Sequence, residues 1–300
     1  MKSIHQVAQE TLNYIKDRKD GKITSLKTGY GKLDRCMIDG IEWGSTITIG
    51  GRPSVGKSAF SDCLIDGCLQ NNKDFEILDF NWELSARVIM LRRLSASMKR
   101  TYKNIISADG KLSDLDISNI ETILQQKSSL PITYAEEPLS VKEFGETVRN
   151  FIARSKYGKV LVRIDHTLLA KQTQSSQVQM LLDLMMEANS IKKNGNVIFM
   201  FLTQMNREFE DRQVDGTDQS FPRQSDVYGG DAAAMFSETI ILLNKPSKYG
   251  VRMYGKRRGD KSILAEEHDL FAHIVKNRNS EGDFILHYKE DFKNMSIKEM

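Results

Sequence analysis

The chain has 300 residues, of which 40% are hydrophobic and 28% are charged, a composition typical of a globular protein and not of a disordered one. Its 43 basic residues nearly balance 40 acidic ones, so the net charge of +3 does not by itself indicate nucleic-acid binding. The three cysteines lack paired spacing and no apolar stretch approaches about 18 residues, which argues against a disulfide framework, a zinc ribbon, a secretory signal and a membrane span. We expect a cytoplasmic protein with one large core.

The first predicted element is a short amphipathic helix over residues 3–19, which ends near Asp20 and Gly21. Its apolar residues recur at three- and four-residue spacing, at Ile4, Val7, Ala8, Leu12 and Ile15. A helix of this length is marginal in isolation, so its apolar stripe must pack on another surface. That surface is either the chain's own domain or a neighbouring subunit, and the pattern leaves both open.

From residue 46 onward, short apolar runs alternate with longer helical stretches, which predicts an α/β fold with helices flanking a mostly parallel twisted sheet. The predicted strands are residues 46–50, 75–80, 160–165, 197–203 and 239–243, and the predicted helices are residues 57–70, 85–98, 141–155 and 177–193. Two late apolar runs, residues 270–276 and 284–288, flank a polar loop. They predict an antiparallel hairpin at the edge of the sheet near the C-terminus.

A phosphate-binding pattern, G-x-x-x-x-G-K-[ST], is matched in full by Gly51, Arg52, Pro53, Ser54, Val55, Gly56, Lys57 and Ser58. The motif lies between a predicted strand and a predicted helix, which is the setting it requires. Glycines let successive backbone N–H groups point at a phosphate, and the helix N-terminus adds a favourable potential. We expect Lys57 between the β- and γ-phosphates of ATP and the Ser58 hydroxyl on Mg²⁺. The alternative is a Gly-rich turn that binds no ligand.

An ATP hydrolase needs one carboxylate for the magnesium shell and another that orients or deprotonates the attacking water. Asp165 ends an apolar strand and is the candidate for magnesium, although Arg163 is unexpected in a strand buried on both faces. Glu83 follows the strand 75–80 and is the candidate general base, while Gln204 follows the strand 197–203 and could sense the γ-phosphate. The simpler interpretations are a strand-end acid, a first-turn acid of the next helix and a solvated glutamine.

Several segments together resemble those of one known family. They are residues 28–34, residues 51–58, residues 81–85 with Glu83, Asp165 with His166, residues 202–207 with Gln204, and residues 276–279, which we call the finger loop. These segments resemble the C-terminal motor domain of DnaB-type replicative DNA helicases over about residues 26–288. The resemblance implies a RecA-like P-loop core that uses ATP and Mg²⁺, in a bacterial protein or a phage protein in a bacterial host.

The resemblance also implies an assembly. In such helicases the motor forms a homo-hexameric ring, and the finger loop completes the ATP site of the adjacent subunit. Lys276 and Arg278 would then stabilise γ-phosphate charge in trans, whereas the simpler interpretation is a basic hairpin tip in solvent. Residues 1–25 would be the linker helix that docks on a neighbour, and residues 26–300 the motor domain. The family's helical N-terminal domain, which contacts primase, has no room in this sequence. A loader or primase stays a candidate partner, but the domain through which the family contacts primase is not part of these residues.

Two polar segments, residues 171–177 and 207–230, follow strands that would face the channel of such a ring. Arg207, Arg212 and Arg223 could track the backbone of single-stranded DNA without reading its sequence. Where the family carries a channel arginine, this chain has Tyr228, which could hydrogen-bond a phosphate or stack on a base. The alternative is a set of polar loops that contact only solvent.

The combined motifs predict an ATP-dependent DNA helicase that translocates on single-stranded DNA, 5′ to 3′ by resemblance, and unwinds duplex during replication. A RecA-like recombinase, or a regulatory DNA-dependent ATPase without unwinding activity, would share the same core. A non-catalytic protein that uses the nucleotide as a structural switch is a third possibility, which Glu83 disfavours.

Overall fold

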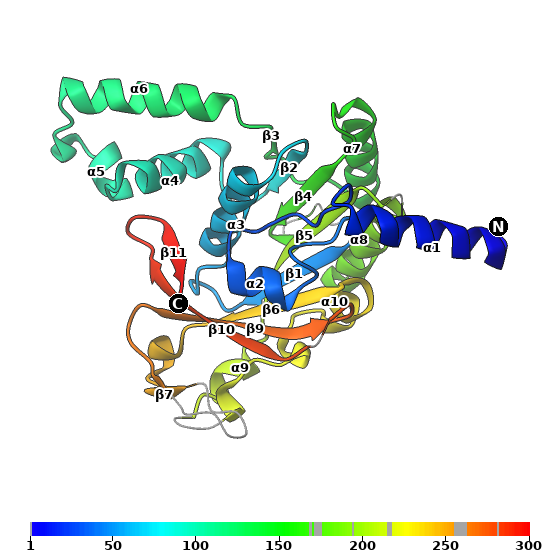
Figure 1. Cartoon of the computed structure of the whole chain (residues 1–300). Coiled ribbons are helices and arrows are strands. Elements are labelled where there is room, and N and C mark those ends of the chain that lie inside the picture. Colours follow the sequence, from blue (N-terminus) through cyan, green and yellow to red (C-terminus); the bar gives the residue numbers. More distant parts are fainter. Residues whose placement is uncertain are drawn as a thin grey trace.

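The computed structural model describes residues 2–167, 170, 176–193, 195–214, 218–254, 263–280 and 282–300. Its main strands are β1 (Thr46–Gly51), β2 (Glu76–Asn81), β3 (Ile132–Ala135), β4 (Val160–Asp165), β5 (Val197–Gln204), β6 (Thr239–Asn244), β9 (Asp269–Asn277), β10 (Phe284–Asp291) and β11 (Ser296–Glu299). Within the described residues these nine strands form one sheet, in the order β11-β10-β9-β6-β1-β5-β4-β2-β3 (Figure 1). A separate antiparallel pair joins β7 (Met253–Tyr254) to β8 (Ile263–Leu264).

The strands from β6 across to β3 all run parallel, which confirms the predicted mostly parallel sheet. Helical crossovers produce this arrangement because each one returns the chain to the same end of the sheet. The predicted C-terminal hairpin is also present, since β9 and β10 pair antiparallel and β9 pairs antiparallel with β6. The hairpin belongs to the antiparallel end of the sheet, where one further strand, β11, pairs with the second half of β10.

Helices cover both faces of the sheet. They are α1 (Ile4–Lys19), α2 (Gly31–Cys36), α3 (Lys57–Asn71), α4 (Ala86–Met98), α5 (Tyr102–Ile106), α6 (Asp114–Ser128), α7 (Val141–Arg154), α8 (Gln177–Lys192), α9 (Glu208–Asp211) and α10 (Gly230–Phe236), with short 3-10 turns at Ala108–Gly110, Asp218–Ser220, Gln224–Asp226 and Pro246–Tyr249. Side chains alternate between the two faces of each strand, so Leu161 packs in one core with α3 while Val162 packs in a second core with α7 and α8.

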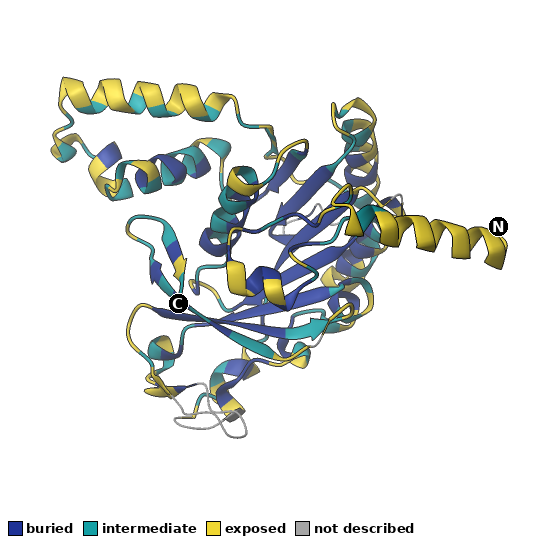
Figure 2. Ribbon diagram, in the orientation of Figure 1, coloured by how far each residue is buried: buried dark blue, intermediate teal, exposed yellow. Residues whose placement is uncertain are grey.

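The N-terminal helix α1 extends from the body of the protein and is exposed along most of its length (Figure 2). A capping box of Ser3 and Gln6 begins it, yet no residue of α1 is buried in the described structure. Its attachment includes hydrogen bonds from the Tyr14 hydroxyl to Glu42, at 2.6 Å, and from Arg18 to the Ser25 hydroxyl, at 3.3 Å. The apolar stripe of the helix therefore does not pack on its own domain.

A helical arm formed by α4, α5 and α6 connects β2 to β3 and projects from the sheet (Figure 1). An ion pair of 2.8 Å between Arg93 of α4 and Asp66 of α3 ties the base of the arm to the body, and a second of 2.9 Å joins Arg100 to Asp116 of α6. Across the described residues, no helix of the chain is long and apolar enough to cross a membrane.

Arg163, unexpected in a strand buried on both faces, is itself fully buried in β4. Its guanidinium forms ion pairs with Asp79 of β2 and Asp62 of α3. A buried cation is tolerated where carboxylates neutralise it and accept its N–H groups. The objection to β4 as a buried strand was therefore wrong, because the compensating charges come from distant parts of the sequence.

Candidate nucleotide-binding site

The predicted phosphate loop forms the turn between β1 and α3. Gly56 caps α3 with a φ of 100°, a conformation that favours glycine, and a Cβ there would lie 2.2 Å from the ring of Phe292. Lys57 Nζ donates to the carbonyl oxygens of Gly51, at 3.0 Å, and Arg52, at 3.3 Å, so the lysine lies back across the loop. Burial lowers the pKa of Lys57 to about 8, although the carboxylates of Asp165 and Glu83 act to raise it.

The register of the sheet brings the strand-end candidates to the same edge as this loop. Gly51 pairs with Gln204 of β5, while Asp165 of β4 pairs with Asn81 of β2. Because these strands are parallel, their carboxyl ends meet at one edge, where open α/β sheets bind ligands. A cavity of about 470 Å³ opens there, lined by Pro53, Ser54, Gly56, Lys57, Ser58, Ala59, Glu83, Arg92, His166, Gln204, Phe292 and Met295.

Asp165 is buried at the end of β4, and the nearby Ser58 hydroxyl acts to lower the pKa of its carboxylate. Burial raises the pKa of Asp165, against the opposing effects of Arg163 and Ser58. No group of three or more His, Cys, Asp or Glu suited to a metal occurs among the residues described. One hydroxyl and one carboxylate nevertheless fit Mg²⁺, which takes few protein oxygens where phosphates and water supply the rest.

Glu83 and Gln204 approach the same histidine from two sides of the cavity. Glu83 Oε2 lies 3.9 Å from His166 Nε2, and Gln204 Nε2 lies 3.3 Å from the same nitrogen. The Glu83 side chain is 51% exposed, whereas that of His166 is 11% exposed. Glu83 can thus reach a water molecule in the open part of the cavity, while His166 joins it to the end of β5.

Arg52 differs from the rest of the loop in where its side chain points. Its Nε lies 2.8 Å from Glu210 Oε1 of α9, and its Nη1 donates to the Met205 carbonyl oxygen at 2.8 Å. The guanidinium is therefore engaged with α9, and a contact of Arg52 with a phosphate would come from its backbone. The loop is joined in this way to the segment that follows β5.

Five cavity residues were not among the predicted site residues: Ala59, Arg92, His166, Phe292 and Met295. His166 carries a local signal, since it directly follows Asp165. Phe292 and Met295 belong to the turn between β10 and β11, and they reach the phosphate loop because β11 packs on α3. That approach depends on tertiary packing far along the chain, so no local pattern indicates it.

The finger loop lies at the amino ends of the parallel strands, whereas the cavity lies at their carboxyl ends. Asn277, at the end of β9, pairs with Thr239 at the start of β6, and Thr239 pairs with Ile47 near the start of β1. The phosphate loop follows Gly51, at the other end of β1. At about 3.3 Å per strand residue, roughly 13 Å along the sheet separates the levels of Ile47 and Gly51. Lys276 and Arg278 are thus directed away from the cavity of their own chain.

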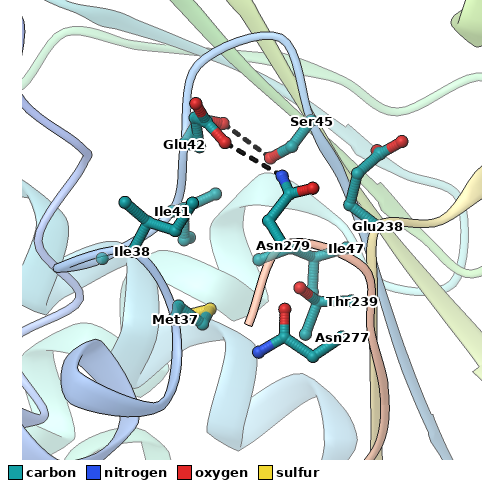
Figure 3. Close-up of a pocket in the computed structure, with 11 residues that line it drawn as sticks. Met37, Ile38, Ile41, Glu42, Ser45, Ile47, Glu238, Thr239, Asn277 and Asn279 are labelled. Carbon is teal, nitrogen blue, oxygen red and sulfur yellow. Dashed lines mark hydrogen bonds between the residues drawn. The ribbon is translucent and has the colours of Figure 1, made fainter. Parts of the chain in front are cut away.

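Both basic side chains of the finger loop contact α10. Lys276 Nζ donates to the Ala234 carbonyl oxygen and Arg278 Nη2 to that of Met235. Arg278 Nη1 lies 3.8 Å from Glu238 Oε1, and about half of the Arg278 side chain is exposed. Burial lowers the pKa of Lys276, and the neighbouring Arg278 adds to the effect. Figure 3 shows the loop around Asn277 and Asn279 beside Glu238, at a small pocket.

The predicted DNA-contacting residues divide into two kinds. Arg207 and Arg223 are exposed, at the start of α9 and of the 3-10 turn Gln224–Asp226. Arg212 instead pairs with Asp226 and donates to the Gln219 carbonyl oxygen at 3.2 Å.

Tyr228 links the two segments that were predicted to face a channel. Its hydroxyl donates to Gln177 Oε1 at 3.2 Å, so the end of the segment 171–177 meets the end of the segment 207–230. Residues 171–175 of the first segment lie outside the described residues, whereas Ser176 and Gln177 lie within them.

Comparison with known proteins decides the family. The family model described as the DnaB-like helicase C terminal domain matches residues 25–296. The chain belongs to this family. It is 25% identical over 259 residues to the replicative DNA helicase DnaC of Bacillus subtilis (strain 168), and 23% identical over 254 residues to the replicative DNA helicase DnaB of Geobacillus stearothermophilus. These alignments cover 85% and 83% of this chain but 53% and 54% of the relatives, so the chain spans about half the length of the curated relatives it matches.

Solved structures agree with this assignment at the level of the fold. The ATPase domain of G40P matches with a TM-score of 0.83 and 18% identity over the whole of both chains. A DnaB-like replicative helicase, solved with its interactions with primase, matches with a TM-score of 0.79 and 17% identity over 99% of this chain and 67% of that one. A KaiC-like protein of Pyrococcus horikoshii OT3 matches with a TM-score of 0.58 and 12% identity, over 93% of this chain and 99% of that one. The predicted RecA-like fold is confirmed.

Proposed function

We propose that this chain is an ATP-driven motor that moves along single-stranded DNA and unwinds duplex as part of a homo-hexameric ring. The observation that carries the proposal is that the candidate catalytic residues lie at two opposite ends of the strands of one sheet. We call these ends the two edges of the sheet. Glu83, Asp165 and Gln204 share the cavity edge with the phosphate loop, while Lys276 and Arg278 lie at the other edge. Basic side chains so placed can act on the nucleotide of a neighbouring copy, as arginine fingers do.

At the cavity edge, the phosphate loop would hold the triphosphate of ATP. Lys57, now bonded to two loop carbonyl oxygens, would exchange them for β- and γ-phosphate oxygens, which bind its positive charge more strongly. Ser58 and Asp165 would hold Mg²⁺, which when bound neutralises phosphate charge. The backbone N–H groups between Gly51 and Gly56 supply the remaining donors.

Hydrolysis needs a base near the γ-phosphate and a group that reports its presence. Glu83 is the base, because its half-exposed carboxylate reaches water while its backbone follows β2 at the same edge. Gln204 is the residue that reports the γ-phosphate. Its side chain lines the cavity, and its backbone carbonyl oxygen accepts the backbone N–H of Tyr228 at 2.9 Å. A movement of Gln204 on loss of the γ-phosphate would therefore reach Tyr228 directly.

Residues 1–25 form the linker helix in this proposal and residues 26–300 the motor. The exposed apolar side chains of α1 support docking on a second copy of the chain, because its own domain buries none of them; they are Ile4, Val7, Leu12 and Ile15. A ring built by repeated docking of one copy on the next would bring each finger loop toward the adjacent cavity.

Single-stranded DNA would pass along the segment 207–230. Arg207 and Arg223 would contact phosphates, Tyr228 a phosphate or a base, and Arg212 would act mainly by fixing Asp226. By analogy with the family, the proposal includes movement 5′ to 3′ and a primase or loader as partner. Co-purification with a candidate primase tests the partner.

The function is tested with the full chain, ATP and Mg²⁺. We expect poly-dT to stimulate hydrolysis at low salt, and a duplex with only a 5′ single-stranded tail to be separated faster than one with only a 3′ tail. Stimulated hydrolysis without strand separation favours the recombinase or regulatory ATPase. Absence of any stimulation by single-stranded DNA overturns the motor assignment.

A further inference from the structure

Two carboxylates among the described residues contact the finger loop from different sides. Glu42 Oε2 accepts a hydrogen bond from Asn279 Nδ2 at 3.0 Å (Figure 3). Glu238 accepts the Arg278 N–H on its carbonyl oxygen at 2.9 Å, and its Oε1 lies 3.8 Å from Arg278 Nη1. Glu238 thus contacts Arg278 directly, and Glu42 contacts the residue next to it in the chain, Asn279.

The two carboxylates are anchored differently. Glu238 Oε2 accepts hydrogen bonds from the backbone N–H of Thr46 and from Lys192 Nζ, each at 2.7 Å. This carboxylate is therefore anchored to β1 and to α8. Glu42 instead uses its second oxygen, Oε1, to accept the hydroxyl of Tyr14 at 2.6 Å. Tyr14 lies on α1, the helix that projects from the body. One planar carboxylate therefore joins α1 to the finger loop.

The backbone on which Glu42 stands is fixed. Ile41 is buried and bridges Leu26, and the Ser45 hydroxyl donates to the Glu42 carbonyl oxygen at 2.6 Å. Burial raises the pKa of Tyr14 and the hydrogen bond to Glu42 adds to the effect, so the phenol remains a donor at neutral pH. A change in the position of α1 relative to its own domain, which we call the seat of α1, would therefore move the Glu42 side chain and not its main chain. The Oε2 atom that accepts the Asn279 hydrogen bond would move with it.

We propose that Glu42 is a positioning residue that makes the geometry of the finger loop depend on the seat of α1. The inference rests on the proposed function, in which Arg278 acts on a neighbouring copy and α1 docks on one. Docking of α1 then sets the Tyr14 hydroxyl, the hydroxyl orients the carboxylate, and the carboxylate presents Asn279 and Arg278 to the adjacent nucleotide. Hydrolysis is in this way restricted to copies whose α1 is seated.

The test uses full-length protein, Mg²⁺ and a fluorescent ADP, with and without aluminium fluoride. ADP with aluminium fluoride imitates the γ-phosphoryl group in transfer, and its tighter binding depends on finger charge. Tyr14→Phe removes the hydroxyl that reaches Glu42 from α1, and Glu42→Ala removes the carboxylate. Tyr157→Phe, at an exposed tyrosine, is the matched control, and Arg278→Ala is the reference for loss of the finger.

We expect Tyr14→Phe and Glu42→Ala to bind ADP as the unaltered protein does but to lose about tenfold of the tightening by aluminium fluoride, the scale of a small misplacement of a catalytic group. Tyr157→Phe should lose none. A purely structural role of Glu42 would weaken ADP binding or assembly as well. The double variant Tyr14→Phe, Asn279→Ala should lose no more than its worse single variant, and additive losses would overturn the linkage.

The outcomes separate this inference from the function on which it rests. If Arg278→Ala retains the tightening, the action of the finger in trans is wrong and the proposed function fails at that step. If Arg278→Ala loses it while Tyr14→Phe and Glu42→Ala retain it, the role of Glu42 is overturned and the proposed function stands. Should Glu42→Ala fold poorly, Tyr14→Phe decides, because it removes one oxygen atom from an exposed side chain.

Discussion

Arg163 of β4 forms a bidentate ion pair with Asp79 of β2: its Nε lies 2.7 Å from Oδ1, and its Nη2 lies 2.6 Å from Oδ2. Arg163 also donates to the Ser61 hydroxyl at 2.9 Å and pairs with Asp62, both on α3. Burial acts to lower the pKa of Arg163, but the two carboxylates outweigh it and raise that pKa well above its usual value. The network ties the strand that ends at Asp165 to the helix that begins at the phosphate loop.

Replacing this arginine should destabilise the whole domain. Arg163→Met keeps the volume but leaves the carboxylates of Asp79 and Asp62 without their cation, which costs about 3–5 kcal/mol of unfolding free energy. Arg154→Met, at an exposed arginine at the end of α7, should cost less than about 0.5 kcal/mol. Unfolding in guanidinium chloride measures both. A loss below about 1 kcal/mol for Arg163→Met would contradict the importance of the network.

Arg163 also shows which features of the fold could be predicted from the sequence and which could not. Apolar runs such as residues 160–165 predicted the parallel strands closely, because period and composition are local properties. The charges that make Arg163 acceptable come from other elements, so no window around it contains the answer. Helix α6 was not predicted: none of its residues is buried, so it lacks a strong apolar face. Strand β3 was missed because it is short and only partly buried.

The candidate site divides in the same way. The phosphate loop is contiguous and its chemistry is written in adjacent residues, so the pattern located it. Glu83, Asp165 and Gln204 followed from the rule that parallel strands end at one edge. Phe292 could not be found, because β11 was not predicted and the turn before it reaches Gly56 by packing. The links from Tyr14 through Glu42 to Asn279 are likewise tertiary.

Lys57→Ala should strongly reduce hydrolysis without unfolding the protein. The variant loses the cation expected on the β- and γ-phosphates, and we expect turnover to fall about 100- to 1,000-fold. Stability should change by less than about 1 kcal/mol, because burial already disfavours the charged lysine in the absence of nucleotide. Lys73→Ala, in the exposed turn after α3, is the control. Normal steady-state turnover of Lys57→Ala would refute the assignment of the loop.

Mixing two inactive variants tests whether the site is shared. Lys57→Ala keeps its finger loop but lacks the phosphate clamp, and Arg278→Ala keeps the clamp but lacks the finger. After co-refolding or subunit exchange at equal amounts, about a quarter of the interfaces combine an intact clamp with an intact finger. Hydrolysis should recover to roughly that fraction of the unaltered rate. A mixture no more active than its components would place both functions in one subunit.

Arg223 and Arg212 should behave differently when each is replaced by alanine. Arg223 is exposed, so Arg223→Ala should weaken poly-dT binding and reduce the slope of log K against log salt by about 0.7, the value for one phosphate contact on a single strand. Arg212→Ala removes the partner of the buried Asp226, so unfolding free energy should fall by about 1–3 kcal/mol. Fluorescence anisotropy and chemical unfolding separate the two effects. Equal salt slopes for Arg223→Ala and the unaltered protein would remove Arg223 from the DNA path.

Charged substitutions on the apolar stripe of α1 should affect assembly and not folding. Ile15→Asp places a carboxylate on a surface that a second copy is proposed to cover, so association should weaken by about tenfold or more. Because no α1 residue is buried in the described structure, the melting temperature of the dilute protein should stay within a few degrees. Asn13→Asp adds the same charge at an exposed polar position. Mass by light scattering across concentrations gives the result, and equal assembly of both variants would contradict docking through the stripe.

The phosphate loop with Lys57 and the finger loop with Arg278 lie on opposite edges of one sheet. In any assembly built head to tail, this placement fixes the number of complete sites. A circle of subunits contains as many working sites as members, whereas a spiral or cracked circle contains one fewer, because the cavity at one terminus faces empty solvent. In the proposed ring, closing that last gap would do more than retain a strand of DNA. It would add the last working ATP site, so circular closure and full catalytic output would arrive in the same event.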